Sequence, residues 1–368
     1  MTKFTDETKF ASGATLKNRL MMSPMTTTQS FYNGEITKDE IEYYSDRAAG
    51  LGAVITGAAN VEDLGKGWFG ELSVAHDEMI PGLSALAKGI QSKDTKAILQ
   101  IVHAGRMTHS AELNGEQIVS ASDIPALRDD AETPRAQTLE EVKETIKSFG
   151  EATRRAIQSG FDGIELHGAN TYLIQQFFSP HSNRRTDEYG GDRDHRFNFI
   201  KEMLVEVFAA VDEYATKPFI VGYRFSPEEF ETPGIRMDDT KWLVDQLSES
   251  RLDYLHVSLN KYASVSRDEN YKAQGRLAYV RDWVNGRKPV VGVGGVRTRQ
   301  DVENVLEVAD LVAVGQQILF DPTWAVKLIS GNDAAMVQIP FKDAVEITPL
   351  SLPLYEFAAA RYHSVILS

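Results

Sequence analysis

The chain has 368 residues, of which 42% are hydrophobic, so it can bury a large core. It carries 39 Lys and Arg against 53 Asp and Glu, a net charge of −14, which argues against a nucleic-acid or anionic-membrane partner. The absence of cysteine excludes disulfides, thiolate metal sites, iron–sulfur clusters and cysteine nucleophiles. The N-terminus lacks the apolar core of a signal peptide, and no run approaches the roughly 20 apolar residues of a membrane span, so we expect a cytoplasmic protein.

Strands and helices alternate through the first half of the chain. After a possible hairpin over residues 4–16, an apolar strand begins at Leu20 and is ended by Pro24. The pattern then predicts a helix at 38–49, a strand at 53–56, a Gly-rich loop at 57–70, a helix after Pro81, a strand at 96–102, a long loop, a helix at 138–159 and a strand at 163–166.

The second half repeats the same alternation. It predicts helices at 194–214, 238–250 and 298–307 and one ending near 285, with strands at 218–223, 254–257, 289–293 and 311–314. Eight apolar strands alternating with helices indicate a parallel sheet buried on both faces, and hence a (β/α)₈ barrel. We expect one domain over 1–368, with a C-terminal extension at about 331–368. A doubly wound open sheet is disfavoured because the Gly-rich turn expected after its first strand is missing.

The loop at 103–137 is the longest segment without clear periodicity, and loops of this length in compact domains are usually functional. Because it follows the third strand, we expect it to cap the active face of the barrel. A disordered insertion is the alternative, but Ile118, Ile124 and Leu127 are expected to be buried, which argues against it.

Reactive groups in such barrels lie at the C-terminal ends of the strands. Small residues after the second, seventh and eighth strands would let a phosphate-bearing cofactor approach the backbone, although Gly294-Gly295 by itself could be a simple tight turn. The candidates at the strand ends are Thr26, Ala58, Gln100, His103, His167, Asn170, Tyr172, Arg224, His256, Ser258, Gly292, Gly294, Gly295 and Gly315.

Three of these candidates follow one strand within six residues. His167 and Asn170 can donate hydrogen bonds and Tyr172 can supply a proton, so together they suit a site that polarises an oxygen and protonates a neighbouring atom. Each residue alone would more often be structural. A metal site made of His103, His167 and His256 is disfavoured, because we expect no carboxylate beside them and Asn170 is a poor ligand.

Four separated motifs lie at these strand ends: NRLMMSPMT at 18–26, QIVHAGR at 100–106, HGANTYLIQQFFSPHSNRRTDEYGG at 167–191 and GVGGVRT at 292–298. With them the chain resembles the Old Yellow Enzyme family of FMN-dependent ene-reductases over about residues 18–330. The resemblance implies that NADH or NADPH reduces bound FMN and leaves, and that an activated alkene then receives a hydride and a proton in a ping-pong cycle.

The resemblance also implies roles for particular residues. Pro24, Met25, Thr26 and Ala58 would line the flavin near C4 and N5, Gln100 and Arg224 its pyrimidine side, and Gly294, Gly295, Gly315 and Gln316 its phosphate. His167 and Asn170 would bind the substrate oxygen, and Tyr172 would deliver the proton. The family usually carries an Arg after Gly315, where this chain has Gln316. FMN would then be held more weakly, or Arg297 or backbone N–H groups would compensate.

Other functions on the same fold stay open. An NADH oxidase or flavin reductase would use the same flavin contacts, and a non-flavin phosphate-binding lyase would use the same glycines. A Schiff-base aldolase is disfavoured because Lys261 lies several residues beyond the sixth strand, and a dienoyl-CoA reductase because it needs a cysteine-bound cluster. The physiological alkene, the choice of NADH or NADPH and the oligomeric state are not specified by the sequence.

Overall fold

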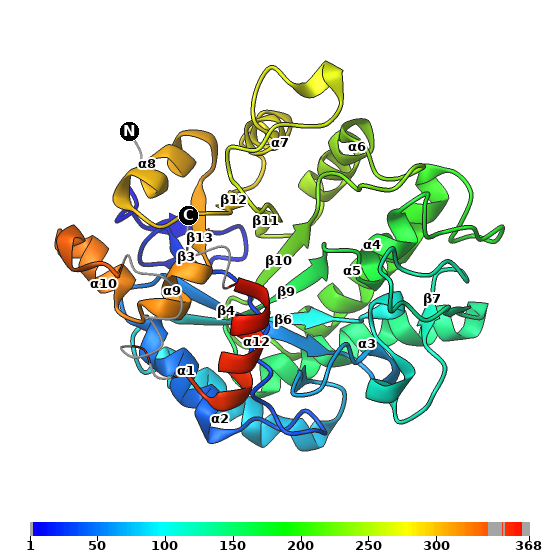
Figure 1. Cartoon of the computed structure of the whole chain (residues 1–368), viewed down its shortest axis with the longest axis horizontal. Helices are drawn as coiled ribbons and strands as arrows, with labels where there is room; N and C mark the ends of the chain where they lie inside the picture. Colours follow the sequence, from blue (N-terminus) through cyan, green and yellow to red (C-terminus); the bar gives the residue numbers. More distant parts are fainter. Residues whose placement is uncertain (1–2, 338–347, 349, 363–368) are drawn as a thin grey trace.

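In the computed structural model, which describes residues 3–337, 348 and 350–362, a closed barrel of eight parallel strands forms the centre. Strand β13 pairs with β3, and β3 pairs with β4, so the sheet closes on itself. This closure confirms the (β/α)₈ prediction and excludes the open sheet (Figure 1). The barrel strands are β3 (Leu20–Met22), β4 (Ala53–Asn60), β6 (Lys96–Val102), β9 (Gly163–Gly168), β10 (Ile220–Phe225), β11 (Tyr254–Val257), β12 (Val290–Val293) and β13 (Leu311–Val314).

Seven predicted helices surround the strands, each within a few residues of its expected bounds. Capping side chains fix several starts: Thr37 accepts a hydrogen bond from the Glu40 amide, and Thr138 forms a capping box with Glu141. These helices are α1 (Lys38–Ala48), α2 (Ile80–Gln91), α3 (Leu139–Gln158), α5 (Arg193–Tyr214), α6 (Met237–Ser248), α7 (Arg276–Val284) and α8 (Arg299–Val308).

Other elements, most of them short, were not predicted. The additional helices are α4 (Leu173–Phe178), α9 (Gln316–Phe320), α10 (Trp324–Ile329) and α12 (Leu352–Tyr362). Single 3₁₀ turns lie at Asp63–Gly65, Asp77–Met79, Gly105–Met107, Ser110–Leu113, Glu269–Tyr271 and Asp333–Ala335. A two-residue strand, β5 (Leu72–Ser73), pairs with β4 in parallel. Of the expected extension at 331–368, residues 338–347, 349 and 363–368 lie outside the described residues.

Three strand ends were predicted too early. Strand β4 continues through Gly57 and Ala58 to Asn60, because a register shift against β6 between Ile55 and Ala58 lets the pairing resume. The expected loop start at 57 is therefore wrong, and Ala58 lies within a strand. Likewise β9 extends through His167 and β10 through Arg224, so these polar side chains are part of the sheet.

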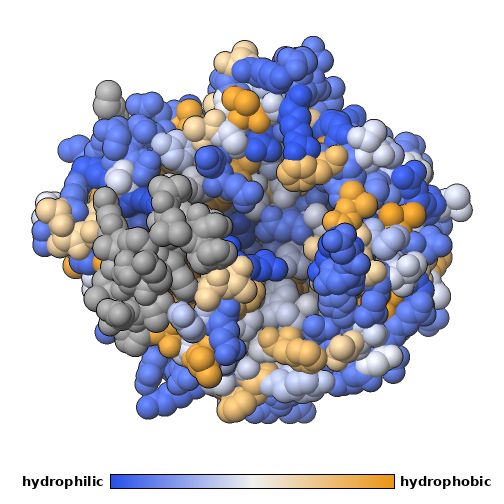
Figure 2. Space-filling view, viewed as in Figure 1, coloured by the Kyte–Doolittle hydropathy of each residue, from blue (hydrophilic) through white to orange (hydrophobic). Residues whose placement is uncertain are grey.

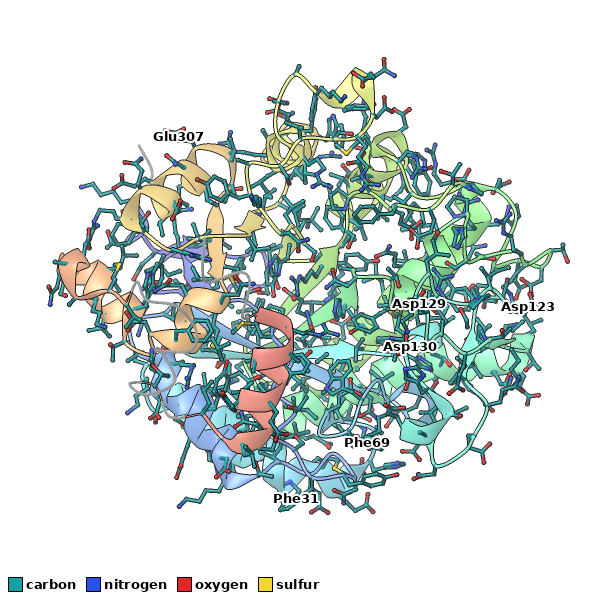
Figure 3. The ribbon with its side chains drawn as sticks, viewed as in Figure 1. Phe31, Phe69, Asp123, Asp129, Asp130 and Glu307 are labelled. Atoms are coloured by element: carbon teal, nitrogen blue, oxygen red, sulfur yellow. The ribbon has the colours of Figure 1, made fainter. Side chains whose placement is uncertain are left out.

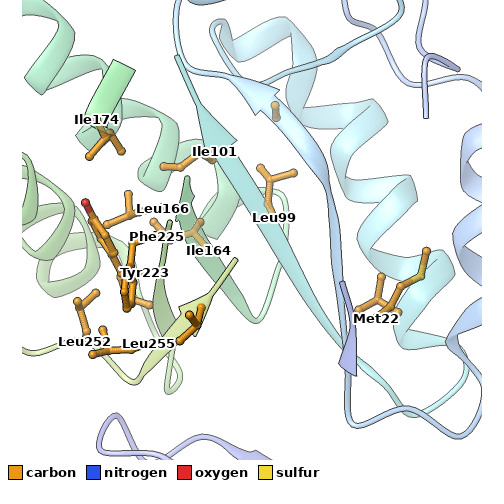
Figure 4. Close-up of a cluster of buried hydrophobic side chains, with 14 of the residues drawn as sticks. Met22, Leu99, Ile101, Ile164, Leu166, Ile174, Tyr223, Phe225, Leu252 and Leu255 are labelled. Atoms are coloured by element: carbon orange, nitrogen blue, oxygen red, sulfur yellow. The ribbon is translucent and has the colours of Figure 1, made fainter. Parts of the chain in front are cut away.

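Two apolar layers hold the barrel together. The outer layer lies between strands and helices and includes Leu99, Ile101, Ile164 and Leu166 (Figure 4). The inner layer fills the N-terminal end of the barrel, where Phe10 of the hairpin β1 (Thr8–Lys9) and β2 (Thr15–Leu16) packs beside Tyr254 with ring centroids 6.0 Å apart. The predicted hairpin thus plugs one end of the barrel, which leaves the opposite end for a site.

The segment 103–137 is ordered and contains a two-stranded pair, β7 (Val119–Ser120) with β8 (Arg135–Ala136). Ile118 is buried and Ile124 half-buried, as expected. Leu127 is 70% exposed, so the prediction of its burial is wrong. Ile118 and Ile124 anchor the segment. Asp129 and Asp130, which follow Leu127, are exposed to solvent (Figure 3).

A buried carboxyl fastens the loop after β3 to helix α1. Glu40 is fully buried and accepts hydrogen bonds from Thr27 Oγ at 2.6 Å and Ser30 Oγ at 2.5 Å. Burial outweighs these two hydroxyl donors and raises the pKa of Glu40 to about 7 from its ordinary 4.5.

The pKa of Glu40 predicts a pH-dependent stability. Protonation stabilises the folded state fully below pH 4.5, and this stabilisation is lost as the pH rises through 7, a change of about 3 kcal/mol. Glu40→Gln cannot ionise. The free energy of unfolding of this variant minus that of the wild type should therefore rise by about 3 kcal/mol between pH 4.5 and 8, as measured by urea denaturation. Glu42→Gln, an exposed change on the same helix, is the control. A difference independent of pH would contradict the assignment.

Candidate active site

The C-terminal ends of the strands open into a polar hollow at the centre of the molecule (Figure 2). The loop after β3 borders it, and α12 is attached to this loop by hydrogen bonds from Thr28 Oγ to the Pro353 carbonyl and from Ser351 Oγ to Gln29 Oε1. Phe31 and Phe69 lie away from the hollow, toward the lower edge of the view (Figure 3). The hollow is therefore the place where the predicted strand-end residues can meet a ligand.

The floor of the hollow is built around Glu165, a fully buried residue of β9. Its carboxylate accepts hydrogen bonds from Gln100 Nε2 at 2.7 Å and from the Tyr254 hydroxyl at 3.0 Å, and His256 Nδ1 lies 2.9 Å away. Tyr254 can reach it only because position 222 is glycine: a Cβ at Gly222 would lie 2.1 Å from the tyrosine ring.

The protonation states of Glu165 and His256 depend on each other and on Arg224. Burial opposes ionisation of Glu165, but His256, Arg224 and Tyr254 together outweigh it and hold the pKa of Glu165 below its ordinary value. Burial lowers the pKa of His256 despite the adjacent carboxylate. Because the ionised carboxylate only accepts, the neutral His256 donates through Nδ1.

Carboxylates do accompany two of the three histidines considered for a metal, contrary to expectation. Glu165 contacts His256, and Glu62 Oε1 lies 3.0 Å from His103 Nε2. Among the described residues, however, no group of three or more His, Cys, Asp or Glu side chains is arranged to hold a metal ion.

His167 is a neutral donor at this site. It is the cross-strand neighbour of Arg224, which in turn neighbours His256. Burial first, and then the positive charge of Arg224, hold the pKa of His167 well below its ordinary value. Its Nδ1 is buried without a hydrogen-bond partner. A proton on Nδ1 would be stranded, so the neutral ring carries its proton on Nε2 and can donate from there.

Asn170 is oriented as a second donor. Its backbone amide donates to Ser226 Oγ at 2.9 Å, and its side-chain Oδ1 accepts from Ser258 Oγ at 3.0 Å. With the oxygen occupied by Ser258, the amide nitrogen of Asn170 is the end available to a ligand.

Tyr172 stands beside His167, with ring centroids 4.8 Å apart and the rings inclined at 64°, and its ring centroid lies 6.2 Å from that of Trp68. Burial, and next the nearby Glu71, raise the pKa of Tyr172 to about 12. Burial raises the pKa of Glu71 as well. The tyrosine therefore keeps its proton at neutral pH and can act as a general acid.

The backbone between the two donors and Tyr172 is strained and held by side chains. Asn170 and Thr171 have φ values of 55° and 62°, which a β-branched residue such as Thr171 adopts only when its surroundings impose it. Gln175 Oε1 accepts from the Thr171 amide at 3.0 Å, and Gln176 Nε2 donates to its carbonyl at 2.6 Å. The two glutamines of the motif thus fix the position of Tyr172.

Gln176 also joins the site to the cap. Its Oε1 accepts from the Arg106 amide at 3.1 Å and from Ser120 Oγ at 2.8 Å, and its Nε2 donates to the Ala104 carbonyl at 3.0 Å. Position 105 must be glycine, because its φ is 59° and a Cβ would lie 2.1 Å from Gln176 Oε1. This interlock explains why the motifs at 100–106 and 167–191 occur together.

The residues predicted for the flavin ring gather on the same floor. Met25 packs against Gly57 of β4 and against Gly315, which follows β13. A Cβ at Gly57 would be 2.7 Å from the Met25 carbonyl oxygen, and a Cβ at Gly315 would be 3.3 Å from the Met25 sulfur. Pro24 is buried, Thr26 half-buried, and Ala58 follows Gly57 in β4. Gln100 commits one amide hydrogen to Glu165, and Arg224 is 8% exposed.

The predicted phosphate loops also lie at this end of the barrel. Gly294 has φ 123°, a conformation open to glycine alone, and a Cβ there would lie 2.5 Å from the Leu259 carbonyl oxygen. Beside Gly295 a Cβ would meet nothing closer than the Asn260 carbonyl oxygen at 3.9 Å. The polar floor fits a flavin ring, whereas the open side of Gly295 has a carbonyl oxygen as its nearest atom. Gln316 is half-buried at the start of α9.

Sequence reasoning missed several residues that organise the site. Glu165 was treated as part of an apolar strand, although a carboxylate between Ile164 and Leu166 is a signal of an inward-facing polar position. Glu71 and Gln176 gave no such signal, because their roles depend on contacts between segments distant in sequence.

The Gln176 interlock predicts a specific instability. Gln176→Met keeps the volume but leaves buried groups of Ala104, Arg106 and Thr171 without partners, which should cost about 3 kcal/mol or more of folding free energy. Amide hydrogen exchange over 103–137 should accelerate. Gln158→Met, at an exposed position of α3, should change neither quantity. Unaltered exchange in the cap would contradict the interlock.

Comparison with known proteins identifies the family of this chain. Residues 9–334 match the model of the NADH:flavin oxidoreductase / NADH oxidase family. The chain is 42% identical to the probable NADH-dependent flavin oxidoreductase YqiG of Bacillus subtilis (strain 168), covering 88% of this chain and 87% of that protein. It is 44% identical to the NADH:acrylate oxidoreductase of Vibrio harveyi over 95% of this chain, which spans only 36% of that relative.

A solved structure of morphinone reductase in complex with tetrahydroNAD superimposes with a TM-score of 0.80 at 22% identity, covering 97% of both chains, and shows the shared fold. No helix in the described part of the chain is long and apolar enough to cross a membrane. The chain belongs to the NADH:flavin oxidoreductase / NADH oxidase family.

Proposed function

We propose that this chain is an NAD(P)H-dependent FMN oxidoreductase that reduces the C=C bond of an activated alkene, such as an enone, an enal or a nitroalkene. One observation carries the proposal: a neutral His167, an Asn170 held by Ser258 and a protonated Tyr172 in ring contact with His167 lie together at the end of β9. An enzyme that only passed electrons to oxygen would need neither a pair of oxygen-binding donors nor a proton donor beside them.

FMN, once reduced by NADH or NADPH, supplies the hydride. His167 and Asn170 donate hydrogen bonds to the carbonyl or nitro oxygen of the alkene, where negative charge develops as the hydride arrives at Cβ. A single donor of this kind contributes roughly 3 to 4 kcal/mol to the transition state. Tyr172 gives its proton to Cα and recovers one afterwards. Arg224 would hold the pyrimidine side of a bound FMN and supply positive charge to it.

The relatives support the class of acceptor. Acrylate and fumarate, in the names of the Vibrio harveyi protein and of the NADH:fumarate oxidoreductase of Klebsiella pneumoniae (strain 342), are alkenes activated by a carboxyl group. This chain spans 36% and 37% of those two proteins, so their names do not assign either substrate to this site.

NADH oxidase activity is the second candidate, because the chain is 34% identical to an NADH oxidase of Thermoanaerobacter brockii over 86% of its length. The two functions differ in what the reduced enzyme reacts with, oxygen or an alkene. They also differ in whether that reaction needs Tyr172.

Reoxidation of the reduced holoenzyme tests the proposal. In anaerobic stopped-flow measurements, Tyr172→Phe should slow reoxidation by 2-cyclohexen-1-one about 10²- to 10⁴-fold, because the general acid is lost. Reduction by NADH and reoxidation by oxygen should be unchanged. Since the pKa of Tyr172 is about 12, the wild-type rate with the enone should be flat from pH 6 to 9.

Tyr214→Phe, at a half-exposed tyrosine on the far end of α5, is the control and should match the wild type. If Tyr172→Phe and the wild type reacted equally fast with the enone, the protonating role would be wrong. If neither reacted with any activated alkene while both reacted with oxygen, NADH oxidase would be the better description.

A further inference from the structure

Helix α12 carries a positive charge across the barrel mouth. Thr28 Oγ donates to the Pro353 carbonyl at 3.2 Å and Ser351 Oγ donates to Gln29 Oε1 at 2.6 Å, so the start of the helix is fixed to the loop after β3. From there α12 projects over the centre of the barrel (Figure 1). Arg361 lies about two turns further along the helix than Pro353. The helix thus places this arginine away from its anchored end.

Arg361 is on the face of α12 that is turned toward the protein. Leu354 is 2% exposed and Ala358 is fully buried, so these two residues mark the inward face. Arg361 follows Leu354 by seven positions and Ala358 by three, a spacing that puts all three residues on one side of a helix. The Arg361 side chain is nevertheless exposed. An inward-facing side chain stays exposed where the space beneath it is hollow.

The charge of Arg361 acts on Tyr172, the proposed proton donor. Three arginines oppose the rise of the Tyr172 pKa, and Arg361 has a larger effect than Arg128 or Arg224. Arg224 belongs to β10, which pairs directly with the strand that precedes Tyr172. Because the interaction between charges weakens with distance, an effect larger than that of Arg224 places the Arg361 guanidinium close to the phenol. The end of α12 and the end of β9 therefore border the same hollow.

The guanidinium of Arg361 is available to a ligand. It lies over the Phe357 ring, 5.1 Å from the ring centroid. A contact with an aromatic ring leaves the positive charge in place. Within the part of the chain that the structure describes, Arg361 makes no ion pair or hydrogen bond. Its N–H donors can therefore all serve an anion.

The other charges that act on Tyr172 are already balanced or suppressed. Arg128 Nε lies 3.2 Å from Asp130 Oδ1, and the positive charge of Arg224 acts on the ionised Glu165. Burial raises the pKa of Glu71 well above its ordinary value, so this carboxyl is held in its neutral form. Among the described residues, Arg361 is thus the charge beside Tyr172 that a bound anion would compensate.

We propose that Arg361 binds a carboxylate of the substrate, so that the enzyme acts on activated alkenes that carry an acidic group. The inference rests on the proposed alkene reduction and narrows it to anionic acceptors. Arginine suits this role because its planar guanidinium can donate two parallel hydrogen bonds to one carboxylate. The activating oxygen would bind His167 and Asn170 while the carboxylate binds Arg361, which fixes the alkene at two points beside Tyr172.

Two ligands that differ in charge isolate this contact: trans-4-oxo-2-pentenoate, an enone that carries a carboxylate, and its neutral methyl ester. Because the oxidised holoenzyme has no hydride to give, the dissociation constants of both can be measured by calorimetry without turnover. Arg361→Gln should weaken binding of the acid about ten- to a hundredfold and leave binding of the ester unchanged. Arg361→Lys, which keeps the charge but loses the paired donors, should have a smaller effect. Reoxidation of the reduced enzyme should show the same selectivity in its second-order rate constants.

Arg281→Gln is the matched control, because it removes one positive charge from an exposed position of α7. An equal loss of acid and ester binding in Arg361→Gln would indicate a structural role of α12 and overturn the inference. Unchanged binding of the acid in Arg361→Gln, or an equal loss in Arg281→Gln, would also overturn it, while reduction of both ligands by the wild type would still support the proposed function. A wild type that binds the acid through Arg361 but reduces neither ligand would confirm the carboxylate site and contradict alkene reduction.

Discussion

The buried carboxylate of Glu165 is the charge on which the barrel mouth depends. Its position between Gln100, Tyr254 and His256 offsets the positive charge of Arg224 inside the protein. Arg224 and Glu165 are opposite buried charges that influence each other, so removal of either would leave the other less compensated. With Arg224 fixed next to it in the sheet, His167 cannot easily acquire a second positive charge. One acidic residue therefore leads to a neutral hydrogen-bond donor where the substrate oxygen is proposed to bind.

Mechanical support of the site comes from a different residue. The amide of Gln176 is saturated with four partners that belong to the β6 loop, the cap and the strained Thr171. The strained backbone at Asn170 and Thr171 brings His167, Asn170 and Tyr172 close together. Hydrogen bonds that Gln175 and Gln176 make with Thr171 stabilise this strained backbone. The segment 103–137 thus contributes to the positioning of Tyr172.

The sequence predicted the barrel because apolar strands of similar length alternate with well-capped helices, and this pattern is local. The strand ends were harder, since His167 and Arg224 are polar yet belong to the sheet, where they face the barrel interior and alternate with outward apolar residues. Ala58 was placed beyond its strand because a register shift has no sequence signature. Leu127 was expected to be buried on hydrophobicity alone. Buried residues are mostly hydrophobic, but a hydrophobic residue is often exposed, as Leu127 is.

The candidate site was predictable where its residues cluster in one motif, as His167, Asn170 and Tyr172 do. It was not predictable where a role depends on a partner from another element, as with Glu71 beside Tyr172 and Glu62 beside His103. In each of these cases the fold brings together side chains that are tens of residues apart.

The central claim, that His167 and Asn170 bind the substrate oxygen above the flavin, is tested most directly by a crystal structure of the oxidised holoenzyme with para-hydroxybenzaldehyde. The account predicts the phenol stacked on the flavin, with its oxygen within hydrogen-bond distance of His167 Nε2 and of the Asn170 side-chain nitrogen. A phenol bound in the hollow with its oxygen directed away from both side chains would contradict it.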